Sequence, residues 1–203
     1  MPGKAGFAAR ARRPGQMGVA GLPRKREPTT ARRLLLAAFG LLLLGGVWFL
    51  TGGAERVWTW YAGPADQGRV PTLGAERRQK PTDSLACSPG ICAARLDISL
   101  PDYREPPAEL IQRLDRIILS DRRLARVDDG SRPDYRRYVA RTPVLRFPDT
   151  IEARALARGE GSALILYGRS LLGANDWGAN HGRLALWAAE LDDLRVVPAA
   201  VTP

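Results

Sequence analysis

The chain has 203 residues, 45% of them hydrophobic, which suffices for one domain of about 100 to 120 residues with appendages. Its formal net charge is +10, but residues 1–33 carry nine Lys or Arg and one acidic residue, Glu27. The remainder carries 22 basic and 20 acidic residues. The excess charge is thus a property of the tail, which argues against a nucleic-acid-binding domain.

Residues 1–33 repeat Gly, Pro and Arg without an apolar period. Such a segment cannot bury enough apolar surface to fold, so we predict a disordered basic tail.

An uncharged apolar run follows at Leu34–Thr51. Its 18 residues approach the length of a helix that crosses the hydrocarbon core, so we predict a transmembrane helix over residues 34–54 and the bilayer as a partner. Basic residues crowd its N-terminal side, which places the tail in the cytoplasm. Aromatic residues near the far end resemble an interfacial belt: Trp48, Trp58, Trp60 and Tyr61. The rest of the chain is then exported, on the side of the membrane opposite to nucleic acid.

A cleaved signal peptide is the alternative for this run, because Gly52, Gly53 and Ala54 offer small residues for a peptidase. The run exceeds the usual apolar core of a signal peptide, and the aromatic cluster would serve no purpose after cleavage. We therefore favour an uncleaved anchor.

Residues 55–85 are rich in Pro, Gly and charge, which predicts a linker. Cys87 and Cys92 follow in C-S-P-G-I-C, and outside the cytoplasm this pair indicates a small-loop disulfide. A metal site would need two further ligands, and the chain has one histidine, His181, so we predict no metal. We also predict no cofactor.

The exported domain is predicted at residues 86–195, with a C-terminal tail at 196–203. A helix should begin at Pro106 and Pro107, with an apolar stripe of Leu110, Ile111, Leu114, Ile117 and Ile118. Short strands are predicted at Leu124–Val127, Arg137–Phe147, Ile151–Leu156 and Ala163–Tyr167, with a turn at Pro148 and Asp149.

A second helix is predicted after Asp176, whose carboxylate suits an N-cap. Its apolar face consists of Leu184, Trp187, Ala188 and Leu191. The fold class is α+β: a small, mostly antiparallel sheet of three to four strands packed with two helices and preceded by one transmembrane helix.

A motif of the form G-x-x-D-x-G-x-N-x-x-R precedes and enters this helix, at Gly173, Asp176, Gly178, Asn180 and Arg183, after Arg169 and Ser170. This motif resembles the domain of unknown function 1499 family. The segment Tyr138–Glu152 resembles the paired strands of that family, and the resemblance runs roughly from Pro107 to Leu191. It implies the fold and gives no activity.

The candidate ligand-binding residues are Arg169, Ser170, Asp176, Asn180, His181 and Arg183. A helix N-terminus attracts anions, and either arginine could add a fork of donors to a carboxylate or phosphate. The partner would be a small anionic ligand or an envelope protein. Alternatively the motif is architecture: Asp176 caps the helix, and Asn180 and Arg183 satisfy buried carbonyls. Gly178 and Gly182, spaced i and i+4, then let the helix lie close to the strands, with Trp177 filling the space beside that contact.

A hydrolase-like enzyme could use Asp176, His181 and Arg183, with the imidazole as general base. The chain has no nucleophile elbow, no phosphate-binding glycine loop and no second histidine for zinc. We therefore predict a non-catalytic binding or accessory module, anchored in a bacterial inner membrane with its domain in the periplasm.

Overall fold

The computed structural model describes residues 29–78 and 81–196. Most of the predicted tails, 1–33 and 196–203, lies outside these residues. Contacts divide the chain into two units, one ending at Leu42 and the other beginning at Leu43.

The apolar run is helical. α1 spans Thr30–Trp48, a π-helical turn spans Phe49–Gly53, and α2 spans Ala54–Ala62. Among the described residues, Thr30–Ala62 is one helical stretch that is long and apolar enough to cross a membrane, by length and composition. A φ of 140° at Gly52 kinks it. Residues predicted to start a linker therefore form a helix instead.

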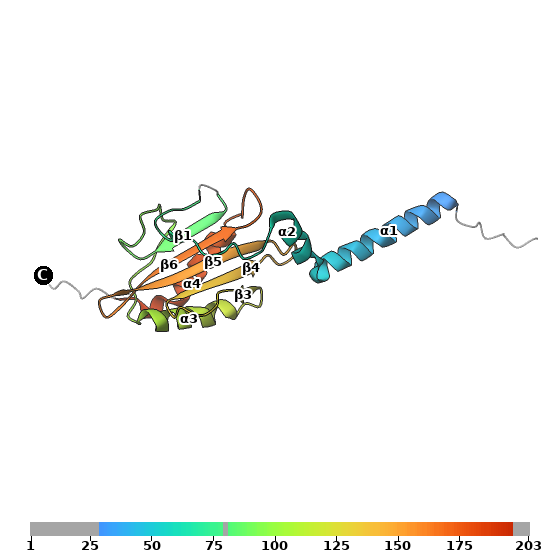
Figure 1. Cartoon of the computed structure of the whole chain (residues 1–203). Coiled ribbons are helices and arrows are strands. Elements are labelled where there is room, and N and C mark those ends of the chain that lie inside the picture. Colours follow the sequence, from blue (N-terminus) through green and yellow to red (C-terminus); the bar gives the residue numbers. More distant parts are fainter. Residues whose placement is uncertain (1–28, 79–80, 197–203) are drawn as a thin grey trace, which may run out of the picture. The chain divides into compact units, whose positions relative to one another are not determined.

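Six strands form the sheet of the second unit, in the order β2-β1-β6-β5-β4-β3 (Figure 1). They span Asp83–Cys87 (β1), Ile98–Ser99 (β2), Leu124–Arg126 (β3), Tyr135–Arg141 (β4), Pro148–Arg158 (β5) and Gly161–Ser170 (β6). All neighbours pair antiparallel except β1 and β2, which are parallel. The class predicted from sequence, α+β with a mostly antiparallel sheet, is confirmed.

The predicted strand number, three to four, is wrong. β1 contains polar and small residues and β2 has two residues, so neither carries a clear apolar alternation. Their strand conformation comes from pairing, since β1 hydrogen-bonds along β6. Pro148 and Asp149, predicted as a turn, begin β5, and the connection from β4 is residues 142–147.

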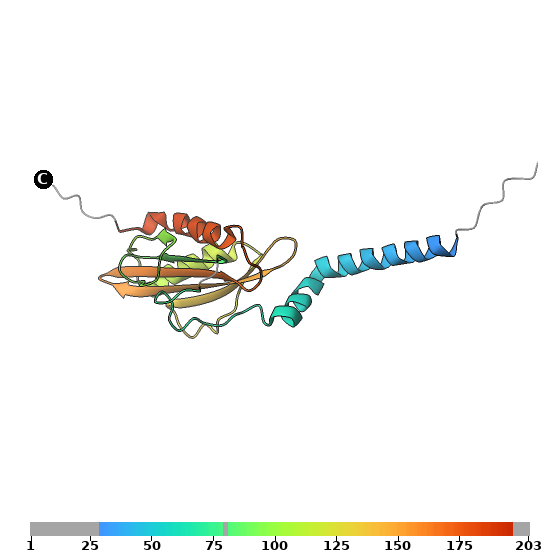
Figure 2. The same ribbon diagram turned by 90° about the horizontal axis from the view of Figure 1, so that it is seen from above.

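Two helices cover one face of the sheet: α3 (Pro107–Leu119) and α4 (Ala179–Glu190). Figure 2 shows both on the same side. The α3 stripe is buried at Leu110, Ile111, Leu114 and Ile118, against inward residues of the strands such as Ile151 and Leu166. Because side chains alternate along a strand, the neighbouring residues face the opposite way.

The opposite face is covered by irregular chain that follows α2, visible beneath the sheet in Figure 2. Val70 and Leu73 pack there on Leu85 and Ile165, beside the disulfide that joins Cys87 to Cys92. A Cβ at Gly74 would lie 2.7 Å from the Cys92 Sγ, so this covering segment lies directly on the disulfide. Residues predicted as a linker thus form one layer of the domain.

We expect the double variant Cys87→Ala, Cys92→Ala to unfold more easily, because the bridge restricts the unfolded chain. The expected loss is about 2 kcal/mol in the free energy of unfolding, as for a short closed loop. Urea unfolding of the full chain in detergent micelles measures it. Reduction of the wild type should give the same shift, and an unchanged midpoint in both experiments would contradict the expectation.

Candidate functional site

Arg183 joins α4 to the sheet. Its Nη1 donates to Asp149 Oδ2 at 2.7 Å and to Asn180 Oδ1 at 3.1 Å. Asp149 is buried at the start of β5, and α4 presents Arg183 one turn after Asn180. The motif arginine therefore holds a buried carboxylate and reaches solvent with the rest of its guanidinium.

Asn180 is fully buried over Gly168 of β6. Its Nδ2 donates to Thr82 O at 3.2 Å and to Ser170 Oγ at 3.1 Å. A Cβ at Gly168 would lie 2.7 Å from the Asn180 Oδ1, so only glycine leaves room for this amide. The contact sets how closely α4 approaches the sheet.

Asp176 accepts hydrogen bonds from the Gly178 and Asn180 amides, each at 3.0 Å. It therefore satisfies the start of α4, although the helix begins later than predicted, at Ala179, with Gly178 as N-cap. Trp177 does not fill the interior: its side chain is 91% exposed, and its φ is 54°. The close approach predicted at Gly178 and Gly182 is also wrong, because nothing lies within 4 Å of a Cβ added at either position.

The structure separates the other candidates. Ser170 faces the helices and meets Asn180, whereas Arg169, its neighbour on β6, faces the opposite layer. His181 is exposed, and its side chain has no hydrogen bond or ion pair with any described residue. The carboxylate of Asp176 is engaged by backbone amides rather than by His181. Arg183 binds Asp149 and Asn180, so the three residues named for a hydrolase share no hydrogen bond with one another.

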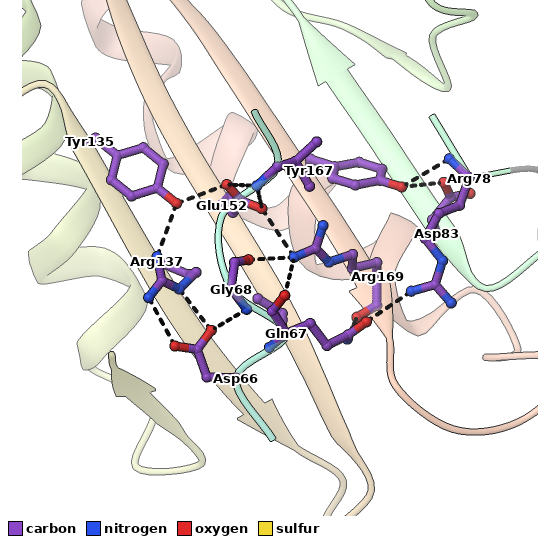
Figure 3. A network of polar contacts seen from close by, with 12 residues as sticks. Asp66, Gln67, Gly68, Arg78, Asp83, Tyr135, Arg137, Glu152, Tyr167 and Arg169 are labelled. Carbon is purple, nitrogen blue, oxygen red and sulfur yellow. Dashed lines mark hydrogen bonds and ion pairs between the residues drawn. The ribbon is translucent and has the colours of Figure 1, made fainter. Parts of the chain in front are cut away.

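Arg169 belongs to a buried polar network on the opposite face, drawn in Figure 3. Its centre is Glu152, which accepts from Tyr135 Oη at 2.8 Å and from the Val70 amide at 3.0 Å, and lies 3.3 Å from Arg169 Nη2. Arg169 also donates to the carbonyl of Gly68. These bonds join the covering segment to β4, β5 and β6.

Ion pairs and a tyrosine extend the network to both sides in Figure 3. Arg137 binds Asp66 through two bonds of 2.7 and 2.9 Å. Tyr167 donates to Asp83 at 2.7 Å, and burial, followed by this hydrogen bond, raises the pKa of its hydroxyl to about 12. Most polar groups here are bound to one another, so the network fastens layers together. Tyr135 and Arg137 also line an open hollow of about 330 Å³ at its side.

An open cleft of about 470 Å³ lies between α3, α4 and the β3–β4 edge. Its apolar lining includes Ile117, Leu186 and Trp187. Five arginines and two acidic residues line it: Arg113, Arg116, Arg123, Arg141, Arg183, Asp121 and Glu190. Arg183 is the one predicted site residue that reaches this cleft.

The cleft arginines differ in how firmly they are held. Arg113 pairs with Asp193 at 3.1 Å and Arg123 with Asp121 at 2.7 Å, both near the surface. The hydrogen bonds that Arg123 donates to Asp121 lower the pKa of the Asp121 carboxyl. Arg116 is exposed and pairs with no described residue. Sequence reasoning missed this cleft because its arginines come from four separate elements; the recurrence of Arg113 and Arg116 on one helix was the only local signal.

No group of three His, Cys, Asp or Glu among residues 29–78 and 81–196 lies where it could hold a metal ion. The fold and the cleft together define an α+β domain with a groove rich in arginine, preceded by a helix long and apolar enough to span a membrane.

Residues 88–191 match the family described as protein of unknown function DUF1499, and the chain belongs to this family. No curated protein and no solved structure matches the chain. The resemblance seen in the motif is thus confirmed, and the match begins one residue after β1.

We expect Gly168→Ala to lower the free energy of unfolding by about 1–3 kcal/mol, because the new methyl group overlaps Asn180. In an Asn180→Ala background the same change should cost much less, giving a coupling energy in a double-mutant cycle. Thermal unfolding of the four proteins measures it.

Gly182→Ala is the matched control. Gly182 lies in α4 with nothing within 4 Å of an added Cβ, so alanine should stabilise by about 0.5–1 kcal/mol. Equal costs for Gly168→Ala in both backgrounds would show that the Asn180 contact does not require glycine.

We expect protonation of Asp97 to lower the free energy of unfolding as the pH falls. Burial alone raises the pKa of this carboxyl, but hydrogen bonds from Arg77 and the Leu85 amide lower it overall. A pKa depressed in the folded state adds stability above the unfolded value, near 3.8, which is lost as the pH falls. Asp97→Asn should therefore flatten the slope of stability against pH below about 4. A slope identical to wild type would contradict this.

Proposed function

We propose that the chain is a membrane-anchored, non-catalytic binding module of a bacterial envelope, with its domain in the periplasm. The helical stretch Thr30–Ala62 supports the anchor. The basic residues ahead of it support a cytoplasmic N-terminus. The disulfide between Cys87 and Cys92 supports an oxidising compartment for the domain.

The ligand we propose is a small anionic molecule held in the cleft between α3 and α4. The observation that carries this proposal is the lining of five arginines against two acidic residues in one open groove of about 470 Å³. Guanidinium groups bind carboxylate and phosphate through paired hydrogen bonds. Arg183 is already oriented for this, because Asp149 and Asn180 both engage its Nη1 and leave the remaining donors of the fork.

An incoming anion can compete with the pairs that exist. The pairs of Arg113 and Arg123 are solvent-exposed, and exposed pairs contribute little to stability. Arg116 pairs with no described residue, so an anion can bind it without breaking an ion pair. The apolar residues of the lining, Ile117, Leu186 and Trp187, favour an anion that also carries a hydrocarbon portion.

We expect the full chain in lipid nanodiscs to bind butyl phosphate or butyrate and to ignore butanol, which has the same chain without the charge. Arg116→Gln should weaken anion binding about tenfold, since one charge-assisted hydrogen bond is lost. Isothermal titration calorimetry, with empty nanodiscs subtracted, measures both.

Arg122→Gln is the matched control, because Arg122 is also exposed, in the turn between α3 and β3, but is absent from the cleft lining. It should bind the anions like wild type. Equal loss in the two variants would indicate a general charge effect, and no anion binding by wild type would refute the proposed ligand class.

A further inference from the structure

The loop between β4 and β5 is a closed structure with an apolar tip. The Thr142 amide donates to Phe147 O at 3.1 Å, and the Phe147 amide donates to Thr142 Oγ1 at 2.9 Å. Between them, Val144 and Leu145 are 64% and 45% exposed. The loop therefore holds two adjacent aliphatic side chains in solvent instead of folding them inward.

α2 fixes this loop from one side. Trp58 Nε1 donates to Leu145 O at 2.6 Å, and its ring lies 4.8 Å from that of Phe147. Glu55 pairs with Arg146 at 2.6 Å and with Arg141 at 2.8 Å. The backbone of the tip is therefore tied to the helix that directly follows the apolar run.

The end of the apolar run lies at the same place. Phe49, within the uncharged run Leu34–Thr51, packs edge-on against Trp58 with ring centroids 5.9 Å apart. Two successive ring contacts, Phe49 with Trp58 and Trp58 with Phe147, thus connect the last turn of the run to the loop. A run that ends at a bilayer surface must bring the loop to that surface.

α2 also presents residues suited to that surface. Trp60 and Tyr61 are 86% and 71% exposed, and Arg56 is exposed on the same helix. Trp and Tyr favour the headgroup level of a membrane, and arginine pairs with lipid phosphate. Within the aromatic cluster predicted from the sequence, Trp58 is the residue that contacts the β4–β5 loop, through Leu145 and Phe147.

We propose that Val144 and Leu145 insert into the bilayer at which the apolar run ends, with Trp60 and Tyr61 at headgroup level beside them. The inference rests on the proposed anchoring and adds a second membrane contact made by the domain itself. The occupant is the lipid surface, because the tip is continuous with the end of the run through Trp58. Arg141 and Pro143 belong to the cleft lining and flank this tip, so the cleft would open beside lipid headgroups.

The test places a nitroxide on single cysteines of the full chain in vesicles of mixed zwitterionic and anionic phospholipid. Both native cysteines are in the disulfide, so an added cysteine is the one free thiol. Val144→Cys reports on the tip, and Leu42→Cys reports on the apolar run. Glu160→Cys is the control: it is exposed in the turn after β5, about 34 Å along the strand from the loop. Access to oxygen and to a water-soluble nickel chelate is measured by electron paramagnetic resonance.

The label at Val144 should show an oxygen-to-nickel access ratio several-fold above that at Glu160 and comparable to that at Leu42. A tip label that resembles Glu160, with Leu42 in lipid, overturns the inference and leaves the anchor intact. Leu42 in water overturns both. A tip label shielded from both reagents shows that protein covers the tip, which also overturns the inference.

Discussion

A buried carboxylate, that of Glu152, joins parts of the chain that lie far apart in sequence. It receives the Tyr135 hydroxyl and the Val70 amide and faces the guanidinium of Arg169. Uncompensated burial of any one of these groups would be costly, so they require one another. Through them an irregular segment becomes a layer of the domain, and the sheet has both faces covered. The strands that border the groove on the helix side are thereby covered on their other face.

Much of the helix side could be predicted from sequence. The apolar stripe of α3 recurs at helical spacing and is buried as that period requires. The motif predicted a capping carboxylate at Asp176 and partly buried polar groups with partners. Asp176 does cap α4, and Asn180 is fully buried with partners. These features are local in sequence, and periodicity and capping chemistry are sufficient to find them.

The other side depends on contacts that no local pattern encodes. Residues 66–78 have the composition of a linker and become ordered because Asp66 and Val70 meet partners on β4 and β5. Arg169 and Ser170 were grouped because the strand was predicted to end at Tyr167. β6 continues to Ser170, and alternation along it sends the two side chains to opposite faces. The arginine cleft likewise forms only when α3, α4 and the strands β3 and β4 converge.

The position of β1 has a consequence for where this domain can be cut. The family match starts at residue 88, but β1 ends at Cys87 and separates β6 from β2. A fragment that begins with the match would leave β6 as a bare edge and β2 with nothing to pair with, and unpaired edges promote association between chains. It would also lose Thr82, whose carbonyl receives the Asn180 amide. A fragment that keeps β1 and the Thr82 contact must therefore begin before residue 82, and one that keeps the ion pair of Asp66 with Arg137 must begin upstream of Asp66.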